Sequence, residues 1–317
     1  MQRGNRRSIK SEKAGESLEK IIIVGAGPAG ISAALYAARA NMDPLVINNG
    51  VGALEKAEKI ENYYGLSHPM SGKELHETGL AQARALGVRI MDAQVLGMDG
   101  FDTFEIKTTE GTLEAQSVIL ATGSKRKTPE IPGIKKFEGK GVSYCAVCDA
   151  FFYRGKEVAV LGNSDFALHE ASELSNTAGT VTIYTNGKEP EFSKESPYPV
   201  NTMKIQAIEG EEKVAGIRLE ADMTAQEKGN EITSFMPADG VFVALGTAGS
   251  TEMARQMGAE LTDKGHIKVD ESMESTIPGL FAAGDCTGGL LQVAKAVHDG
   301  AQAGISAIQY VRKRGAS

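Results

Sequence analysis

One stretch near the start of the chain constrains the fold more than any other. Residues 20–24 (KIIIV) are mostly β-branched, residues 25–30 read GAGPAG, and residues 28–40 are rich in alanine. The length would suit a membrane helix, but the glycines, Pro28 and the β-branched start favour a buried strand, a tight turn and a helix. Residues 44–48 (PLVIN) predict a second strand, so the stretch opens a βαβ unit.

The same order of elements recurs in the middle of the chain. Residues 156–161 predict a strand, residues 165–175 a helix, and residues 181–184 the next strand. Two such units predict an α/β fold with two dinucleotide-binding domains, Rossmann-like and three-layered. Further strands are predicted at residues 117–121, 215–220, 241–245 and 279–283, and a long helix at residues 291–312.

Glycines mark the ends of two predicted strands, in Ala121-Thr122-Gly123-Ser124 and in Leu245-Gly246-Thr247. Both are typical of crossings between domains. We therefore predict a flexible N-terminal arm, a discontinuous first domain and a central domain inserted into it. Their bounds are residues 1–18 for the arm, 19–125 and 249–317 for the first domain, and 126–248 for the central domain.

Composition narrows the class of protein. A length of 317 residues suits two domains, and a net charge of −7 argues against a protein that binds nucleic-acid backbones. Three cysteines are too few for the disulfide framework of a secreted protein. The first 20 residues carry six basic side chains but no apolar core, unlike a signal peptide. We expect a cytoplasmic protein that enters no membrane.

The GAGPAG loop predicts where a dinucleotide binds. Gly25 permits the tight turn, Gly27 lets the backbone approach a pyrophosphate, and Gly30 permits close packing of the helix on the strand. The N-terminus of the helix faces the negative charge. The loop alone does not choose between FAD and NAD. The second strand ends in Asn48-Asn49-Gly50, without the acidic residue that would hold an NAD ribose, which weakens a plain NAD interpretation.

A second motif, FAAGD at residues 281–285, leads from a predicted strand to the last helix. The Asp285 carboxylate could accept a hydrogen bond from a ribityl hydroxyl, and the following helix could stabilise negative charge at the N1–O2 edge of a flavin. The alternative is that Asp285 only caps a helix. Cys286 follows directly, and we interpret it as a small buried residue.

Cys145 and Cys148 form a CxxC motif, which indicates redox or metal chemistry in a reducing compartment. A zinc site would need two further ligands at suitable spacing, and neither Cys286 nor the five histidines supply it. A reducible disulfide is therefore the favoured interpretation, with no metal.

The motifs occur in an order that resembles the low-molecular-weight thioredoxin reductases. They are GAGPAG, YAARAN, Glu61-Asn62-Tyr63-Tyr64-Gly65, Ala121-Thr122-Gly123, Cys145-Ala146-Val147-Cys148-Asp149 and AAGD, and they span residues 19–312. The resemblance implies bound FAD, a homodimer and a central domain that rotates. It implies that Cys148 lies against the flavin, that Cys145 attacks the disulfide of thioredoxin, and that Asp149 is a general acid/base. The alternative for Asp149 is a helix N-cap.

The expected FAD contacts fall into two groups. The loop supplies Gly25, Gly27, Pro28, Ala29 and Gly30. The others follow from the resemblance and come from both ends of the chain. They are Asn48, Asn62, Thr122, Gly123, Asp285, Gln292 and Val293.

The second βαβ unit departs from the family pattern. Ser164 stands where the second glycine of the loop should be, and Phe166 adds a bulky side chain to the same turn. The family's arginines, which clamp the 2′-phosphate of NADPH, are replaced by the run 185–190 (TNGKEP), whose only cation is Lys188. Segment 185–214 also looks shortened. We expect NADPH to be a poor donor.

The combination of an intact FAD motif and CxxC motif with an altered NADPH site resembles the ferredoxin-dependent flavin thioredoxin reductases. We therefore favour ferredoxin as the donor. Deazaflavin-dependent relatives and relatives that hold a second flavin show the same loss. Lys125, Arg126, Lys127, Lys135 and Lys136 could dock an acidic ferredoxin or simply be a solvated linker. Three other functions stay open: an NADPH-dependent enzyme with a variant site, a flavin oxidase, and a non-enzymatic redox sensor.

Overall fold

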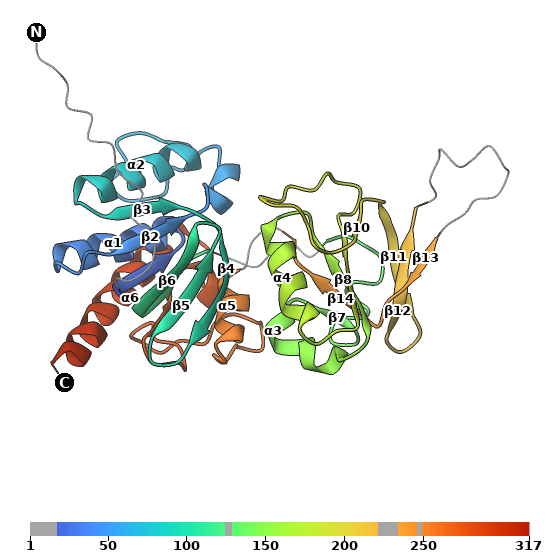
Figure 1. Ribbon diagram of the computed structural model, residues 1–317. Helices are drawn as coiled ribbons and strands as arrows, with labels where there is room; N and C mark the ends of the chain where they lie inside the picture. Colours follow the sequence, from blue (N-terminus) through green and yellow to red (C-terminus); the bar gives the residue numbers. More distant parts are fainter. Residues whose placement is uncertain (1–17, 124–128, 221–233, 246–248, 317) are drawn as a thin grey trace, which may run out of the picture.

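The computed structural model describes residues 18–123, 129–220, 234–245 and 249–316. Figure 1 shows two lobes side by side, each built around its own sheet. One lobe holds a seven-stranded sheet, and the other holds a five-stranded sheet and a small three-stranded one. Within the described residues, no helix combines the length and the apolar character needed to cross a membrane.

The seven-stranded sheet joins the two ends of the chain. Its central strand β1 runs parallel to β2 and β6, with Ile22 level with Leu45 and Val118, and β15 pairs in parallel with β6. Ile22 and its neighbours are buried on both faces, which explains the unbroken apolar run. The strands are β1 (Glu19–Val24), β2 (Leu45–Asn48), β3 (Arg89–Asp92), β4 (Val95–Gly100), β5 (Phe104–Thr108), β6 (Gly111–Leu120) and β15 (Leu280–Ala282).

Helices α1 (Pro28–Arg39) and α6 (Val293–Gly315) pack closely against each other. A Cβ atom on Gly300 would lie 2.0 Å from the carbonyl oxygen of Ala29, and one on Gly304 would lie 2.8 Å from that of Ala33. The two glycines therefore permit the close approach of the helices. The same lobe contains η1 (Gly52–Lys56), α2 (Gly72–Ala85), α5 (Ser250–Gln256) and η4 (Asp285–Thr287).

The five-stranded sheet of the second lobe is parallel, in the order β10-β9-β8-β14-β7. Helix α4 (Asp165–Ser175) packs on β8 and β9, and the antiparallel strands β11, β12 and β13 form the outer sheet. The remaining bounds are β7 (Val142–Ser143), α3 (Ala146–Asp149), η2 (Ala150–Tyr153), β8 (Glu157–Leu161), β9 (Thr180–Tyr184), β10 (Val200–Asn201), β11 (Ile205–Gly210), β12 (Val214–Leu219), β13 (Phe235–Pro237) and β14 (Gly240–Val243).

The predicted α/β fold is confirmed, and both βαβ units have the predicted order of elements. The antiparallel meander β4–β6 and helix α2 were not predicted. Strand β6 begins at Gly111, earlier than expected, because its first half belongs to that meander. The boundary predicted at residue 125 and the one at residue 248 lie outside the described residues, as does the arm up to residue 17. The domain division stays a prediction.

Candidate functional site

The GAGPAG loop leaves space beside the N-terminus of α1. Gly25 has φ +112°, and a Cβ atom on it would lie 2.5 Å from the carbonyl oxygen of Ala121. A Cβ atom on Gly30 would lie 1.8 Å from the carbonyl oxygen of Gly25, whereas nothing lies within 4 Å of one on Gly27. Packing therefore requires the first and third glycines, and the second faces open space where a pyrophosphate can approach.

The parallel strands bring the predicted cofactor residues to one edge of the sheet. Val24, Ile47, Leu120 and Ala282 are level with one another in register. The loops that follow these strands therefore leave from the same edge. A Cβ atom on Gly284 would lie 3.0 Å from Cβ of Ala29. The GAGPAG and AAGD motifs, far apart in the chain, are thus in contact. The two motifs are residues 25–30 and residues 282–285.

Asn48 is the last residue of β2, and the oxygen of its side chain could accept a hydrogen bond from a ligand. Its Nδ2 donates to Oδ1 of Asp92 over 2.6 Å, and its buried Oδ1 has no hydrogen-bond partner among the described residues. A hydroxyl group of a ribose could donate to that oxygen. Asp92, at the end of β3, supplies this edge with the carboxylate that the sequence of β2 lacks. Sequence reasoning missed Asp92 because it lies on the neighbouring strand.

Thr122 follows β6 and is tied to the start of α5. Its Oγ1 lies 2.7 Å from Oγ of Ser250 and accepts from the backbone N–H of Ser250 over 2.8 Å. Gly123 has φ +84°, and no atom lies within 4 Å of an added Cβ. Ser250 was not predicted, because nothing in the sequence pairs it with Thr122.

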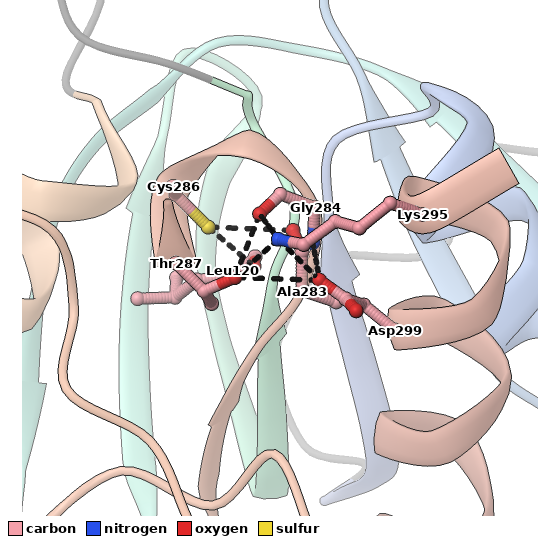
Figure 2. Close-up of polar contacts among 7 residues, drawn as sticks. All are labelled: Leu120, Ala283, Gly284, Cys286, Thr287, Lys295 and Asp299. Carbon is pink, nitrogen blue, oxygen red and sulfur yellow. Dashed lines mark hydrogen bonds and ion pairs between the residues drawn. The ribbon is translucent and has the colours of Figure 1, made fainter. Parts of the chain in front are cut away.

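An ion pair between a largely buried lysine and a buried aspartate holds the turn at Gly284 (Figure 2), the residue that precedes Asp285. Nζ of Lys295 lies 2.6 Å from Oδ2 of Asp299 and donates to the carbonyl oxygen of Gly284 over 2.8 Å and to Oγ1 of Thr287 over 2.7 Å. Asp299, only 2% exposed, also accepts from the N–H of Gly284 over 3.1 Å. The pair thus engages both backbone polar groups of Gly284. Burial raises the pKa of Asp285, and the charge of Lys295 opposes that shift.

We expect Lys295→Met to destabilise the protein by about 3 kcal/mol, because it leaves the carboxylate of Asp299 buried without its cation. The melting temperature of the FAD-loaded protein, measured by circular dichroism, should fall by about 5–10 °C. Lys268→Met is the matched control, since Lys268 forms an equally short ion pair with Glu260 on the surface. It should leave the melting temperature nearly unchanged. Equal effects of the two variants would contradict the role given to the buried pair.

The N-terminus of α6 lies beside the loop that carries Asn62. Nδ2 of Asn62 donates to Oε1 of Gln292 over 3.1 Å. Gln292 is the N-cap of α6 without a side-chain cap bond, and Val293 is the first helical residue. Residues from the start and the end of the chain therefore meet at a helix N-terminus, which favours negative charge.

The CxxC motif follows β7. Cys145 is buried and disulfide-bonded, whereas Cys286 is a free buried thiol whose pKa burial raises to about 11. Ser143 Oγ donates to Oδ2 of Asp149 over 2.6 Å and accepts from the N–H of Cys145 over 3.1 Å. Asp149 makes no cap bond to η2, so its carboxylate is linked to Cys145 rather than to a helix end.

The second nucleotide loop is covered by the chain itself. The N–H of Glu191 donates to the carbonyl oxygen of Asn163 over 2.7 Å, and Nδ2 of Asn163 donates to the carbonyl oxygen of Glu189 over 3.2 Å. The N–H of Ser193 donates to Oδ1 of Asp165 over 2.8 Å. We call residues 189–193 the strap, because they lie across the start of α4.

The interpretation of Phe166 as an obstacle in this turn is wrong. Its side chain is 1% exposed and packs in the core beneath α4. The helix turns it inward because Phe166 lies on the same face as other buried residues of α4. Crowding of the second loop therefore comes from the strap and not from Phe166, and the obstruction by Ser164 stays a prediction.

The remaining predictions concern the basic residues before the CxxC motif and the possibility of a metal site. Of the basic residues, 125–127 lie outside the described residues, and Nζ of Lys136 donates to the carbonyl oxygen of Gly210 over 3.3 Å. Lys136 also lies 4.4 Å from the ring centroid of Phe137. Among the residues that the structure describes, no three His, Cys, Asp or Glu side chains gather as a possible metal site.

Comparison with known proteins places the chain in a family. The family model described as pyridine nucleotide-disulphide oxidoreductase matches residues 19–300. Thioredoxin reductase of Listeria monocytogenes is 33% identical over 312 residues, which cover 94% of this chain and 95% of the relative.

Two solved structures are similar along nearly the whole chain. The atypical thioredoxin reductase TRi from Desulfovibrio vulgaris Hildenborough has a TM-score of 0.84 and 38% identity, with 93% of this chain and 98% of that chain covered. A ferredoxin-flavin thioredoxin reductase from Clostridium acetobutylicum has a TM-score of 0.67 and 33% identity, with the same coverage.

The chain therefore belongs to the pyridine nucleotide-disulphide oxidoreductase family. It is a flavin disulfide oxidoreductase of the thioredoxin reductase type, and its cofactor is FAD. The first sheet edge fits that cofactor, because it combines the open space at Gly27, the unpartnered oxygen of Asn48 and the helix N-terminus at Val293.

Proposed function

We propose that this protein reduces thioredoxin, or a similar protein disulfide, through a redox-active Cys145–Cys148 pair, and that its electrons come from ferredoxin rather than NADPH. The strap is the observation that argues against NADPH, and the choice of ferredoxin rests on the resemblance to the ferredoxin-dependent enzymes. Its backbone is hydrogen-bonded to Asn163 and Asp165, where the family's second dinucleotide would need access to the loop. Thr185, which directly follows β9, is buried and donates to the carbonyl oxygen of Lys188 over 2.6 Å.

Bound FAD supplies a carrier that accepts electrons from a donor and passes an electron pair to a disulfide. The residues proposed to hold it are those at the first sheet edge: Gly25, Gly27, Pro28, Ala29, Gly30, Asn48, Asn62, Thr122, Gly123, Asp285, Gln292 and Val293. Gly27 would leave room for the phosphates of FAD, and the turn held by Lys295 and Asp299 would present Asp285 to its ribityl hydroxyls.

The cysteine pair is proposed to act by thiol–disulfide exchange. The thiolate of Cys145 attacks a sulfur of the partner's disulfide, the S–S bond of the partner breaks, and Cys148 resolves the mixed disulfide. The leaving thiolate needs a proton. Asp149 is the proposed proton donor, since its carboxyl group is linked through Ser143 to the backbone of Cys145.

The experiment that tests the donor is anaerobic reduction of the FAD-loaded protein, followed by flavin absorbance near ~450 nm. Reduced ferredoxin should bleach the flavin and then produce thiols in added thioredoxin. NADPH and NADH should bleach it at least about 100-fold more slowly, because the strap occupies the second loop. A conventional NADPH-dependent thioredoxin reductase serves as the positive control for the nucleotides.

Each other outcome of this experiment replaces the proposal. Fast bleaching by NADPH identifies a conventional enzyme with a variant site. No bleaching by either donor shifts the assignment to a deazaflavin donor or a second flavin. Rapid oxygen consumption without a protein substrate identifies an oxidase, and bound FAD without turnover identifies a redox sensor.

We also propose a cytoplasmic homodimer with the predicted domain division. This proposal rests on the resemblance of the motifs in residues 19–312 to the low-molecular-weight thioredoxin reductases. Sedimentation velocity at micromolar concentration should give twice the monomer mass of 33.5 kDa.

A further inference from the structure

Glu170 is a carboxyl group in the core of the second lobe. It lies in the middle of α4, on the buried face that otherwise carries Phe166, Ala171 and Leu174, and it is 1% exposed. Burying a carboxyl group costs several kcal/mol unless hydrogen bonds compensate. Its Oε2 accepts a hydrogen bond from the backbone N–H of Ala146 over 2.8 Å. Packing alone would favour an apolar residue here, so the contact with Ala146 points to a role for the carboxylate.

That contact places Glu170 beside the redox-active turn. The N–H of Ala146 belongs to the peptide bond that directly follows Cys145, and Cys145 is itself only 1% exposed. A second carboxylate, that of Asp149, reaches the other side of Cys145 through Ser143, which accepts from the N–H of Cys145. Glu170 therefore binds the backbone directly after the buried cysteine, and Asp149 is linked to the backbone N–H of that cysteine through Ser143.

The arrangement bears on the stability of a thiolate at Cys145. Backbone N–H groups next to a cysteine stabilise its thiolate and lower its pKa. Here the N–H of Ala146 donates to Glu170 and is therefore not free to stabilise a thiolate. A carboxylate that is ionised at this position would also oppose a thiolate, in a medium with little screening. A dithiol whose thiolate is disfavoured is a less stable reduced form, so its disulfide has a lower reduction potential.

We propose that Glu170 is a positioning residue that keeps the reduction potential of the Cys145–Cys148 pair low, so that the reduced pair is a strong reductant. The inference rests on the proposed function only in taking these two cysteines as the redox pair. The carboxylate acts through its charge and through its hold on Ala146, without contact to a substrate.

Glu170→Gln tests the charge, because an amide oxygen can accept the same hydrogen bond. The FAD-loaded protein is equilibrated with reduced and oxidised dithiothreitol, and free thiols are counted. In this exchange the protein disulfide breaks, two thiols form, and dithiothreitol closes to its cyclic disulfide, so electrons and protons balance. We expect the equilibrium to shift about tenfold toward the dithiol, which is about 30 mV for a two-electron couple.

Iodoacetamide should also alkylate Cys145 of the reduced variant several-fold faster at neutral pH. Cys286 adds a constant background, since it is a free buried thiol with a pKa of about 11. Glu173→Gln is the matched control on the same helix. Glu173 pairs with Lys107, 3.4 Å away, and this variant should stay within about twofold of the wild type.

Equal equilibria for Glu170→Gln, Glu173→Gln and the wild type would overturn the proposal, as would a shift toward the disulfide. If the Glu170→Gln variant does not fold, a measurement on the wild-type protein still tests the proposal. In protein labelled with ¹³C-glutamate, the infrared difference spectrum between oxidised and reduced states should contain a glutamate carboxylate band. Its absence would also overturn the proposal. None of these three readouts uses ferredoxin or thioredoxin, so they stay valid if either proves to be the wrong partner.

Discussion

Replacing Cys145 by serine is expected to reduce thioredoxin reduction at least about 1000-fold, because the hydroxyl group cannot form the mixed disulfide. Cys145 belongs to the CxxC motif and is disulfide-bonded in the structure. Its backbone N–H donates to Oγ of Ser143. The proposed FAD site lies on a different sheet, built from strands that do not include β7. FAD binding and reduction of the flavin should therefore be retained.

The measurement is a single turnover. Holoenzyme is photoreduced, mixed anaerobically with oxidised thioredoxin, and the new thiols in thioredoxin are counted. This design needs no knowledge of the natural donor. The absorbance spectrum of the bound flavin is the internal control for an intact cofactor site. Residual reduction above one tenth of the wild-type rate would show that electrons leave by another route than Cys145.

Two substitutions in the GAGPAG loop should differ strongly in their effect on the stability of the protein without cofactor. Gly30→Ala places a Cβ atom 1.8 Å from the carbonyl oxygen of Gly25, and that oxygen belongs to backbone held by β1 and β2. We expect loss of the native fold, or destabilisation by about 4 kcal/mol or more. Gly27→Ala points its Cβ atom into open space, so the apoprotein should melt within about 2 °C of the wild type.

The affinity for FAD, measured beside the stability of the apoprotein, distinguishes the proposed role of Gly27 in binding from the role of Gly30 in packing. Gly27→Ala should weaken FAD binding about 100-fold, or about 2.7 kcal/mol, because its methyl group occupies space that we assign to the pyrophosphate. Apoprotein melting by circular dichroism and FAD binding by quenching of flavin fluorescence give the two values. Unchanged FAD affinity in Gly27→Ala would place the pyrophosphate elsewhere, and a stable Gly30→Ala apoprotein would contradict the packing argument.

Local sequence was sufficient for the parallel core of both lobes. Strand β1 is apolar at every position from Ile21 to Val24 because it is covered on both faces, and the glycines at 25 and 30 are required by contacts within a few residues or one strand away. Such signals lie in consecutive residues, so they can be recognised without knowing the fold. The antiparallel meander β4–β6 lacked a comparable signal, because half of its positions face solvent or carry polar residues.

The polar supports of both sites depended on contacts between distant residues. Asp92 reaches Asn48 because β3 lies beside β2, and Ser250 reaches Thr122 across 128 positions of sequence. The strap is hydrogen-bonded to the second nucleotide loop, and nothing in either sequence predicts this contact. The loss of the family's arginines therefore indicated a changed site without showing that the strap covers it.

The two βαβ units, the GAGPAG loop, the CxxC motif and the altered second loop could be recognised before folding was known, because each consists of residues that are adjacent in the chain. The groups that stabilise them became visible only in the folded protein. Lys295 and Asp299 hold the Asp285 turn from one helix, and Glu170 holds the residue after Cys145 from another. A buried charge is tolerated only where folding brings a partner to it, and the order of strands and helices sets that partner.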